Sequence, residues 1–97
     1  MRVYLLVCDV TKSEDRYQAL SRLIDSKFEN QRLGRFAWAI QTDVPADDLC
    51  ELLSPHITAS DRMMIVRASR DLVWSGFPPK TATWLRKHVL RSDSLDD

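Results

Sequence analysis

The stretch Arg2-Val3-Tyr4-Leu5-Leu6-Val7-Cys8-Asp9 decides the fold class of this 97-residue chain. Its apolar part, from Val3 to Cys8, is short and β-prone, and it is closed by a carboxylate. A short, continuous apolar run of this kind is typical of a strand that is buried on both faces. The stretch therefore predicts the central strand of a sheet, with Asp9 at its carboxyl end.

The sequence that follows predicts helices and strands in alternation. Thr11 and Glu14 have the spacing of a capping box, and the helical recurrence of apolar residues after them predicts a first helix over about 12–27. Residues 35–42 alternate as in a strand packed on one side, and 29–33 is a weaker candidate for a short strand paired with it. The later segments predict a helix opened by Pro45 and limited by Pro55, a strand within 61–69, a hairpin strand at 72–74 and a final helix over about 80–90.

This order of elements is that of an α+β, ferredoxin-like sandwich: βαββαβ with an additional hairpin strand, plus a C-terminal helix. Two helices should cover one face of the sheet, and either the terminal helix or the sheet of a second copy should cover the other. The length allows one domain, 1–91, followed by an acidic tail, 92–97, that is expected to fray. A domain this small often gains stability by dimerising, so we expect a homodimer.

Composition limits the classes of function. Fourteen basic residues balance fourteen acidic ones, so no overall positive field draws the protein onto nucleic acid, and any such binding must be local. No apolar run approaches the ~20 residues of a membrane span, which predicts a cytoplasmic protein with no membrane partner. Cys8 and Cys50 have apolar neighbours and no metal or disulfide spacing, and we interpret both as small core residues in a reducing compartment.

Asp9 is the strongest candidate for chemistry. A carboxylate directly after an apolar strand suits a hard cation such as Mg²⁺ or Mn²⁺, whereas composition and spacing alone favour a carboxylate that only accepts hydrogen bonds from the start of the first helix. One carboxylate is a poor metal site, so a dimer would have to bring two copies of Asp9 together. Three tryptophans could stack on nucleic-acid bases, but their apolar spacing favours core or interface packing: Trp38, Trp74 and Trp84.

Several segments resemble a known group of small proteins. Leu5-Leu6-Val7-Cys8-Asp9-Val10 resembles the first strand of the CRISPR-associated Cas-two proteins, which ends in an aspartate. Residues 37–43, 53–57, 60–66 and 73–77 look more like the short SinR-like proteins grouped with them and with the VapD-like toxins. The chain departs from the Cas-two pattern at Cys8, where an aromatic residue is usual, and at Ala37, where a serine is usual.

The resemblance implies a homodimer that cleaves RNA or DNA with a divalent metal, Mg²⁺ or Mn²⁺, held by the two copies of Asp9 as catalytic residue. We expect three arginines to approach phosphate, namely Arg16, Arg35 and Arg67, and the 73–77 edge to build the dimer interface through Val73, Trp74 and Phe77. The alternative is a non-catalytic homodimeric scaffold or regulator of the same fold that binds protein or nucleic acid. A small-molecule-sensing domain is a third interpretation, for which the sequence carries no ligand motif.

Overall fold

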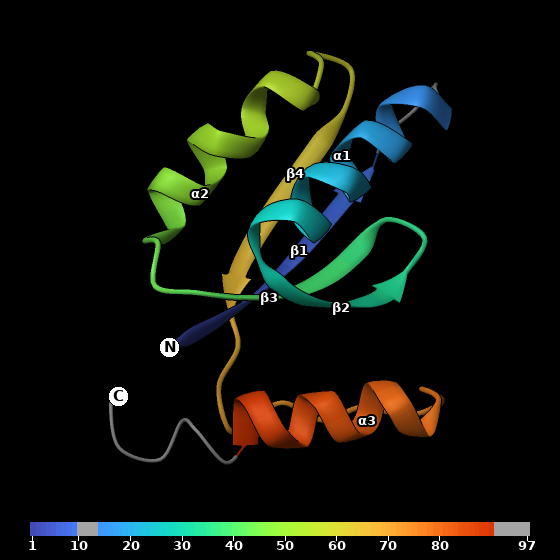
Figure 1. Cartoon of the computed structure of the whole chain (residues 1–97), viewed down its shortest axis with the longest axis vertical. Coiled ribbons are helices and arrows are strands. Elements are labelled where there is room, and N and C mark those ends of the chain that lie inside the picture. The colour runs from blue at the N-terminus through green and yellow to red at the C-terminus, as the bar shows by residue number, and fades with distance from the viewer. Residues whose placement is uncertain (10–13, 91–97) are drawn as a thin grey trace.

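The computed structural model describes residues 1–9 and 14–90, with only the backbone of Glu14 and Arg16 (Figure 1). These residues form an α+β structure with one antiparallel sheet. In chain order the elements are β1 (Arg2–Asp9), α1 (Glu14–Lys27), β2 (Glu29–Gly34), β3 (Ala37–Thr42), α2 (Ala46–Leu53), the 3₁₀ turn η1 (Ser54–His56), β4 (Arg62–Arg67), α3 (Pro79–Leu85) and the π-helical turn η2 (Arg86–Leu90).

The sheet has the strand order β2-β3-β1-β4, so β1 is an inner strand, as its apolar sequence predicts. It pairs antiparallel with both neighbours. Leu6 at its middle lies opposite Trp38 of β3 on one side and Ile65 of β4 on the other. Successive strand residues point to opposite faces, so the even and odd residues of β1 serve two different layers.

The even face of the sheet carries the larger core, under α1 and α2 (Figure 1). Leu6 and Trp38 are fully buried there, together with Ile24 of α1 and Leu49 of α2. Tyr17 of α1 packs its ring edge-on against Phe36, with centroids 5.0 Å apart. The apolar residues that recur at helical spacing in α1 and α2 thus pack on the apolar residues that alternate along the strands, and together they form one buried layer.

The odd face is partly covered by α3, which lies on the other side of the sheet (Figure 1). Leu85 and Val89 pack with Val3 and Ala39 in a second cluster. Two polar contacts fix α3 to the edge strand β2. The Trp84 indole donates to Glu29 Oε2 at 2.8 Å, and the side-chain amide of Gln31 donates to Thr81 Oγ1 at 3.2 Å.

The predicted hairpin strand at 72–74 is wrong. After β4 the chain turns, with the Leu72 N–H donating to the Ser69 carbonyl at 3.0 Å, and it then crosses the odd face without pairing. Leu72 and Trp74 pack against the second cluster instead, and Gly76 takes a positive φ of 87° before α3 begins. The segment 72–74 therefore buries apolar side chains on the odd face of the sheet instead of pairing as a strand at the sheet edge.

Other segments follow the predictions more closely. The weak candidate at 29–33 is confirmed as β2, and the predicted strands at 35–42 and 61–69 correspond to β3 and β4. Cys50 is exposed, so its assignment to the core is wrong, because Leu49 and Leu53 carry the buried stripe of α2. The first half of the proposed capping box, Thr11, and the tail 92–97 lie outside the described residues.

We predict that Leu85→Ala lowers the free energy of unfolding by about 2 to 5 kcal/mol, because it removes a fully buried side chain from the second cluster. Urea denaturation followed by circular dichroism measures the change. Thr83→Ala, on the exposed side of α3, is the matched control and should change stability little. Equal stability of the two variants would show that α3 is not packed on the sheet.

Candidate functional site

Asp9 ends β1 on the odd face of the sheet and is exposed. In the register of the two strands it lies opposite Arg62 of β4. The turn between β2 and β3 lies at the same end of the sheet, since the Cys8 N–H donates to the Phe36 carbonyl at 2.8 Å. Asp9 is therefore an accessible carboxylate with a basic residue as its cross-strand neighbour.

A second carboxylate at this end of the sheet, that of Asp61, belongs to the other face. Asp61 is buried, and its Oδ2 accepts the Thr58 N–H at 3.0 Å in the turn before β4. Burial raises the pKa of the neighbouring Cys8 thiol to about 11, and the charge of Asp61 adds to the rise. Cys8 and Asp9 are successive strand residues, so their side chains point away from each other.

The residues of one chain do not fit a divalent metal. Within 1–9 and 14–90 no three His, Cys, Asp or Glu side chains are grouped where they could hold an ion. Mg²⁺ prefers an octahedral set of oxygen ligands, whereas Asp9 offers one carboxylate opposite an arginine. A metal at Asp9 would need ligands from a second chain.

The structure does not bring the three predicted phosphate-binding arginines together. Arg35 lies in the β2–β3 turn, near the Asp9 end of the sheet, with its guanidinium 5.7 Å from the Tyr17 ring centroid and 5.3 Å from that of Phe36. Arg67 lies opposite Tyr4, five residues further along β1 or roughly 17 Å away. Arg16 belongs to α1, and its side chain is outside the described residues.

Sequence reasoning missed Arg32, whose guanidinium joins β2 to α1. It donates to the Tyr17 hydroxyl and, at 2.8 Å, to Ser21 Oγ. Its guanidinium also lies 5.2 Å from the Tyr17 ring centroid and 5.6 Å from that of Trp38. Only its position opposite Trp38 could have pointed to Arg32 from the sequence. That position depends on the register between β2 and β3, which the polar sequence of β2 does not specify.

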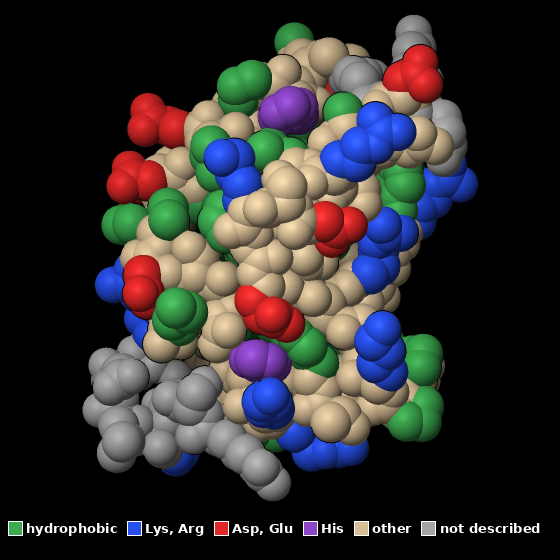
Figure 2. Space-filling view, viewed as in Figure 1, with side chains coloured by type: hydrophobic (Ala, Val, Ile, Leu, Met, Phe, Trp, Pro, Cys, Tyr) green, Lys and Arg blue, Asp and Glu red, His purple; other side chains and the backbone are tan. Residues whose placement is uncertain are grey.

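Acidic side chains gather over α2 at the left of Figure 2, whereas the rest of the visible face carries basic and acidic side chains together. The α2 acids include Asp47 and Asp48 in its first turn. The basic side chains on this face therefore do not form one continuous basic groove.

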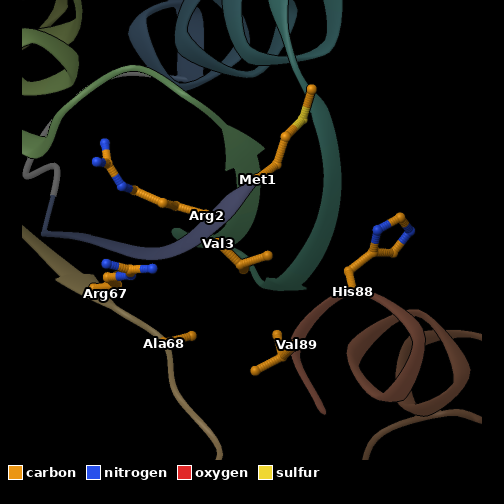
Figure 3. Close-up of a pocket in the computed structure, with 7 residues that line it drawn as sticks. All are labelled: Met1, Arg2, Val3, Arg67, Ala68, His88 and Val89. Atoms are coloured by element: carbon orange, nitrogen blue, oxygen red, sulfur yellow. The ribbon is translucent and has the colours of Figure 1, made fainter. Parts of the chain in front are cut away.

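A small hollow lies between the start of β1, the end of β4 and η2 (Figure 3). Its volume is about 10 Å³, which is the space of one water molecule. Arg2 donates to the Asp43 carbonyl at 3.3 Å and points away from His88 (Figure 3). His88 stacks on Trp84 with ring centroids 4.2 Å apart, and burial lowers its pKa, opposed by the charge of Glu29 and assisted by that of Lys87.

The part of the odd face that α3 leaves uncovered carries exposed apolar side chains. We call it the open-face strip and define it by Leu5, Val7, Met64, Val66 and Val73. Val7, Met64 and Val66 are 46, 57 and 45% exposed, and Val73 is 88% exposed. Leu5 lies opposite Val66, and Val7 lies opposite Met64, so the strand members form two adjacent apolar pairs.

The predicted interface residues at 73–77 lie at one end of this strip. Trp74 and Phe77 are partly buried in the second cluster, whereas Val73 projects from the loop. The loop and Leu5 border a hollow of about 240 Å³ whose lining is mainly apolar. The strip and the hollow are therefore continuous through Leu5.

Comparisons of the chain with protein-family models, with curated proteins and with solved structures found no match. Among the helices of the described ranges, none is long and apolar enough to cross a membrane.

We predict that a thiol reagent labels Cys50 and spares Cys8 in the native protein at pH 8. Cys50 is exposed, whereas Cys8 is buried with a pKa of about 11, so its thiolate fraction at pH 8 is on the order of one in a thousand. Labelling of Cys8 should increase as the pH rises towards that value. Mass spectrometry counts the labels, and unfolding in urea, which should expose both thiols, is the control.

Proposed function

We propose that this protein is a non-catalytic, homodimeric scaffold that associates through its open-face strip. The observation that carries the proposal is the exposure of Val7, Met64 and Val66 on the uncovered half of the sheet. Contiguous apolar side chains on a sheet face gain ~25 cal/mol for each Å² that association removes from water. A second copy of a small domain is the simplest partner for such a surface.

The proposal includes the finer description of the fold as ferredoxin-like. Its support is the antiparallel strand order β2-β3-β1-β4 together with the element order strand, helix, strand, strand, helix, strand. A relation to the Cas-two, SinR-like and VapD-like group is part of the same proposal and rests on the segments quoted above. Balanced charge and dispersed arginines favour a protein partner over nucleic acid for the scaffold.

We expect the wild-type protein to be a dimer at tens of micromolar, with twice the chain mass of 11.2 kDa in size-exclusion chromatography with light scattering. Met64→Asp should weaken dimerisation at least about tenfold, or ~1.4 kcal/mol, because it places a charge in an apolar contact. Leu52→Asp, at an exposed apolar residue of α2 on the other layer, is the matched control. A wild-type monomer would contradict the proposal.

The second candidate function is a metal-dependent nuclease, cytoplasmic and homodimeric, as the resemblance implies. The observation that favours it is the exposure of Asp9 at the end of β1, in the same region as Arg62 and the turn that holds Arg35. Under this proposal a dimer supplies the second Asp9, and Mg²⁺ or Mn²⁺ would supply Lewis-acid chemistry when bound.

For this candidate we expect end-labelled single-stranded RNA, single-stranded DNA or duplex DNA to be cleaved with Mg²⁺ or Mn²⁺ and not with EDTA. Asp9→Asn should abolish cleavage, since it removes the charge that would bind the ion, while the dimer persists. Asp71→Asn, at an exposed loop carboxylate, is the control and should retain activity. Cleavage that survives Asp9→Asn would assign the activity to another residue or to a contaminant.

A further inference from the structure

We propose that the second copy docks on the outer edge of β4, in antiparallel register centred on Ile65, so that two sheets join into one. This inference rests on the proposed homodimer: of the open-face strip, the contact uses Met64 and Val66 on β4 and leaves Val7 of β1 outside it.

The backbone of β4 is poised for such pairing. The Ala68 N–H donates to the Val3 carbonyl at 2.8 Å, which makes this a hydrogen-bonded pair of the antiparallel ladder with β1. Because the pattern alternates, Met64 and Val66 also turn their backbone groups towards β1, while Met63 and Ile65 turn theirs outwards. No strand in the described ranges pairs with that outer edge.

The other sheet edge is protected against pairing. β2 has the polar sequence ENQRLG and an irregular register between Arg32 and Gly34. Its Glu29 and Gln31 side chains are engaged by α3. Charged residues and bulges are the devices that keep edge strands from associating. β4, by contrast, is apolar from Met63 to Val66, with arginines only at its ends.

In one antiparallel register, the residues of β4 complement those of the partner's β4. When Ile65 lies opposite the partner's Ile65, Met64 lies opposite the partner's Val66 on the odd face. These are two of the exposed members of the open-face strip, and they meet as a non-hydrogen-bonded pair, in which side chains come closest. The terminal arginines fall opposite uncharged residues: Arg62 opposite the partner's Ala68, and Arg67 opposite the partner's Met63.

The neighbouring registers are worse. A shift of two residues in one direction carries Arg62 and Met63 past the partner's Ala68, where the partner chain turns away from the edge, so fewer residues pair. A shift of two in the other direction sets Arg62 opposite the partner's Val66, which leaves the exposed valine without an apolar neighbour. The pattern of charges and apolar residues along β4 therefore selects the register centred on Ile65.

The test is disulfide trapping in a Cys8→Ala/Cys50→Ser background, which removes both native thiols. Ile65→Cys should give a covalent dimer under mild oxidation, since opposed Cα atoms in a hydrogen-bonded pair are ~5.5 Å apart and within the range of a disulfide. Met63→Cys is the matched control on the same face, because the two copies of residue 63 would be four residues out of register, about 14 Å apart.

Ile65 is half-buried, so its substitution can disturb the core. A second test therefore places the cysteines at two exposed positions, 64 and 66. Mixing Met64→Cys chains with Val66→Cys chains should yield cross-linked heterodimers, and either chain alone should cross-link at least about tenfold less. Val7→Asp should leave the dimer intact, because Val7 lies one strand away from the edge, whereas it would break a dimer packed face to face.

The outcomes separate the two proposals. A wild-type dimer in which these pairs do not cross-link, or which Val7→Asp dissociates, would overturn the edge pairing and leave the scaffold proposal standing. A monomeric wild type would overturn both, and a strand of another protein would then be the occupant to seek for this edge.

Discussion

Burial of β1 on both faces is the constraint on which the rest of the structure depends. Its even residues, such as Leu6, serve the layer under α1 and α2, and its odd residues, such as Val3, serve the layer under α3. A slip of one residue against β3 or β4 would exchange the two sets and put large side chains in the wrong layer. The apolar run at the start of the chain therefore fixes the register of its neighbours and the side on which each helix packs.

The uncovered part of the sheet follows from where α3 is attached. The contacts Trp84 to Glu29 and Gln31 to Thr81 hold α3 on the β2 side, and its apolar side chains reach Val3 and Ala39. On the odd face, the far end of β1 and β4 are left without cover, so Val7 and Met64 remain exposed. The strip is thus exposed because polar side chains attach α3 to β2, at the opposite edge of the sheet.

Periodicity was sufficient to predict β1, α1, β3 and β4, because each has enough apolar residues at one spacing. It failed at 72–74, since the same alternation suits a strand and an extended segment lying across a sheet face, and only the position of α3 decides between them. Cys50 illustrates a related limit: apolar neighbours in the sequence do not place a residue on the buried stripe of its helix. Asp9 was correctly placed at the strand end, but its separation from Asp61 depends on strand register, which the sequence leaves open.

The geometry of the dimer decides what Asp9 can do. In a sheet joined through β4, three strand spacings and six residues along the strands separate the two copies of Asp9, or roughly 25 Å. A single Mg²⁺ ion, with ligands at about 2.1 Å, cannot span that distance. The edge-paired dimer and a metal shared between two Asp9 carboxylates therefore exclude each other. Since one chain alone offers Asp9 only an arginine as its cross-strand neighbour, pairing through β4 makes this carboxylate a surface charge at the sheet end and favours the scaffold over the nuclease.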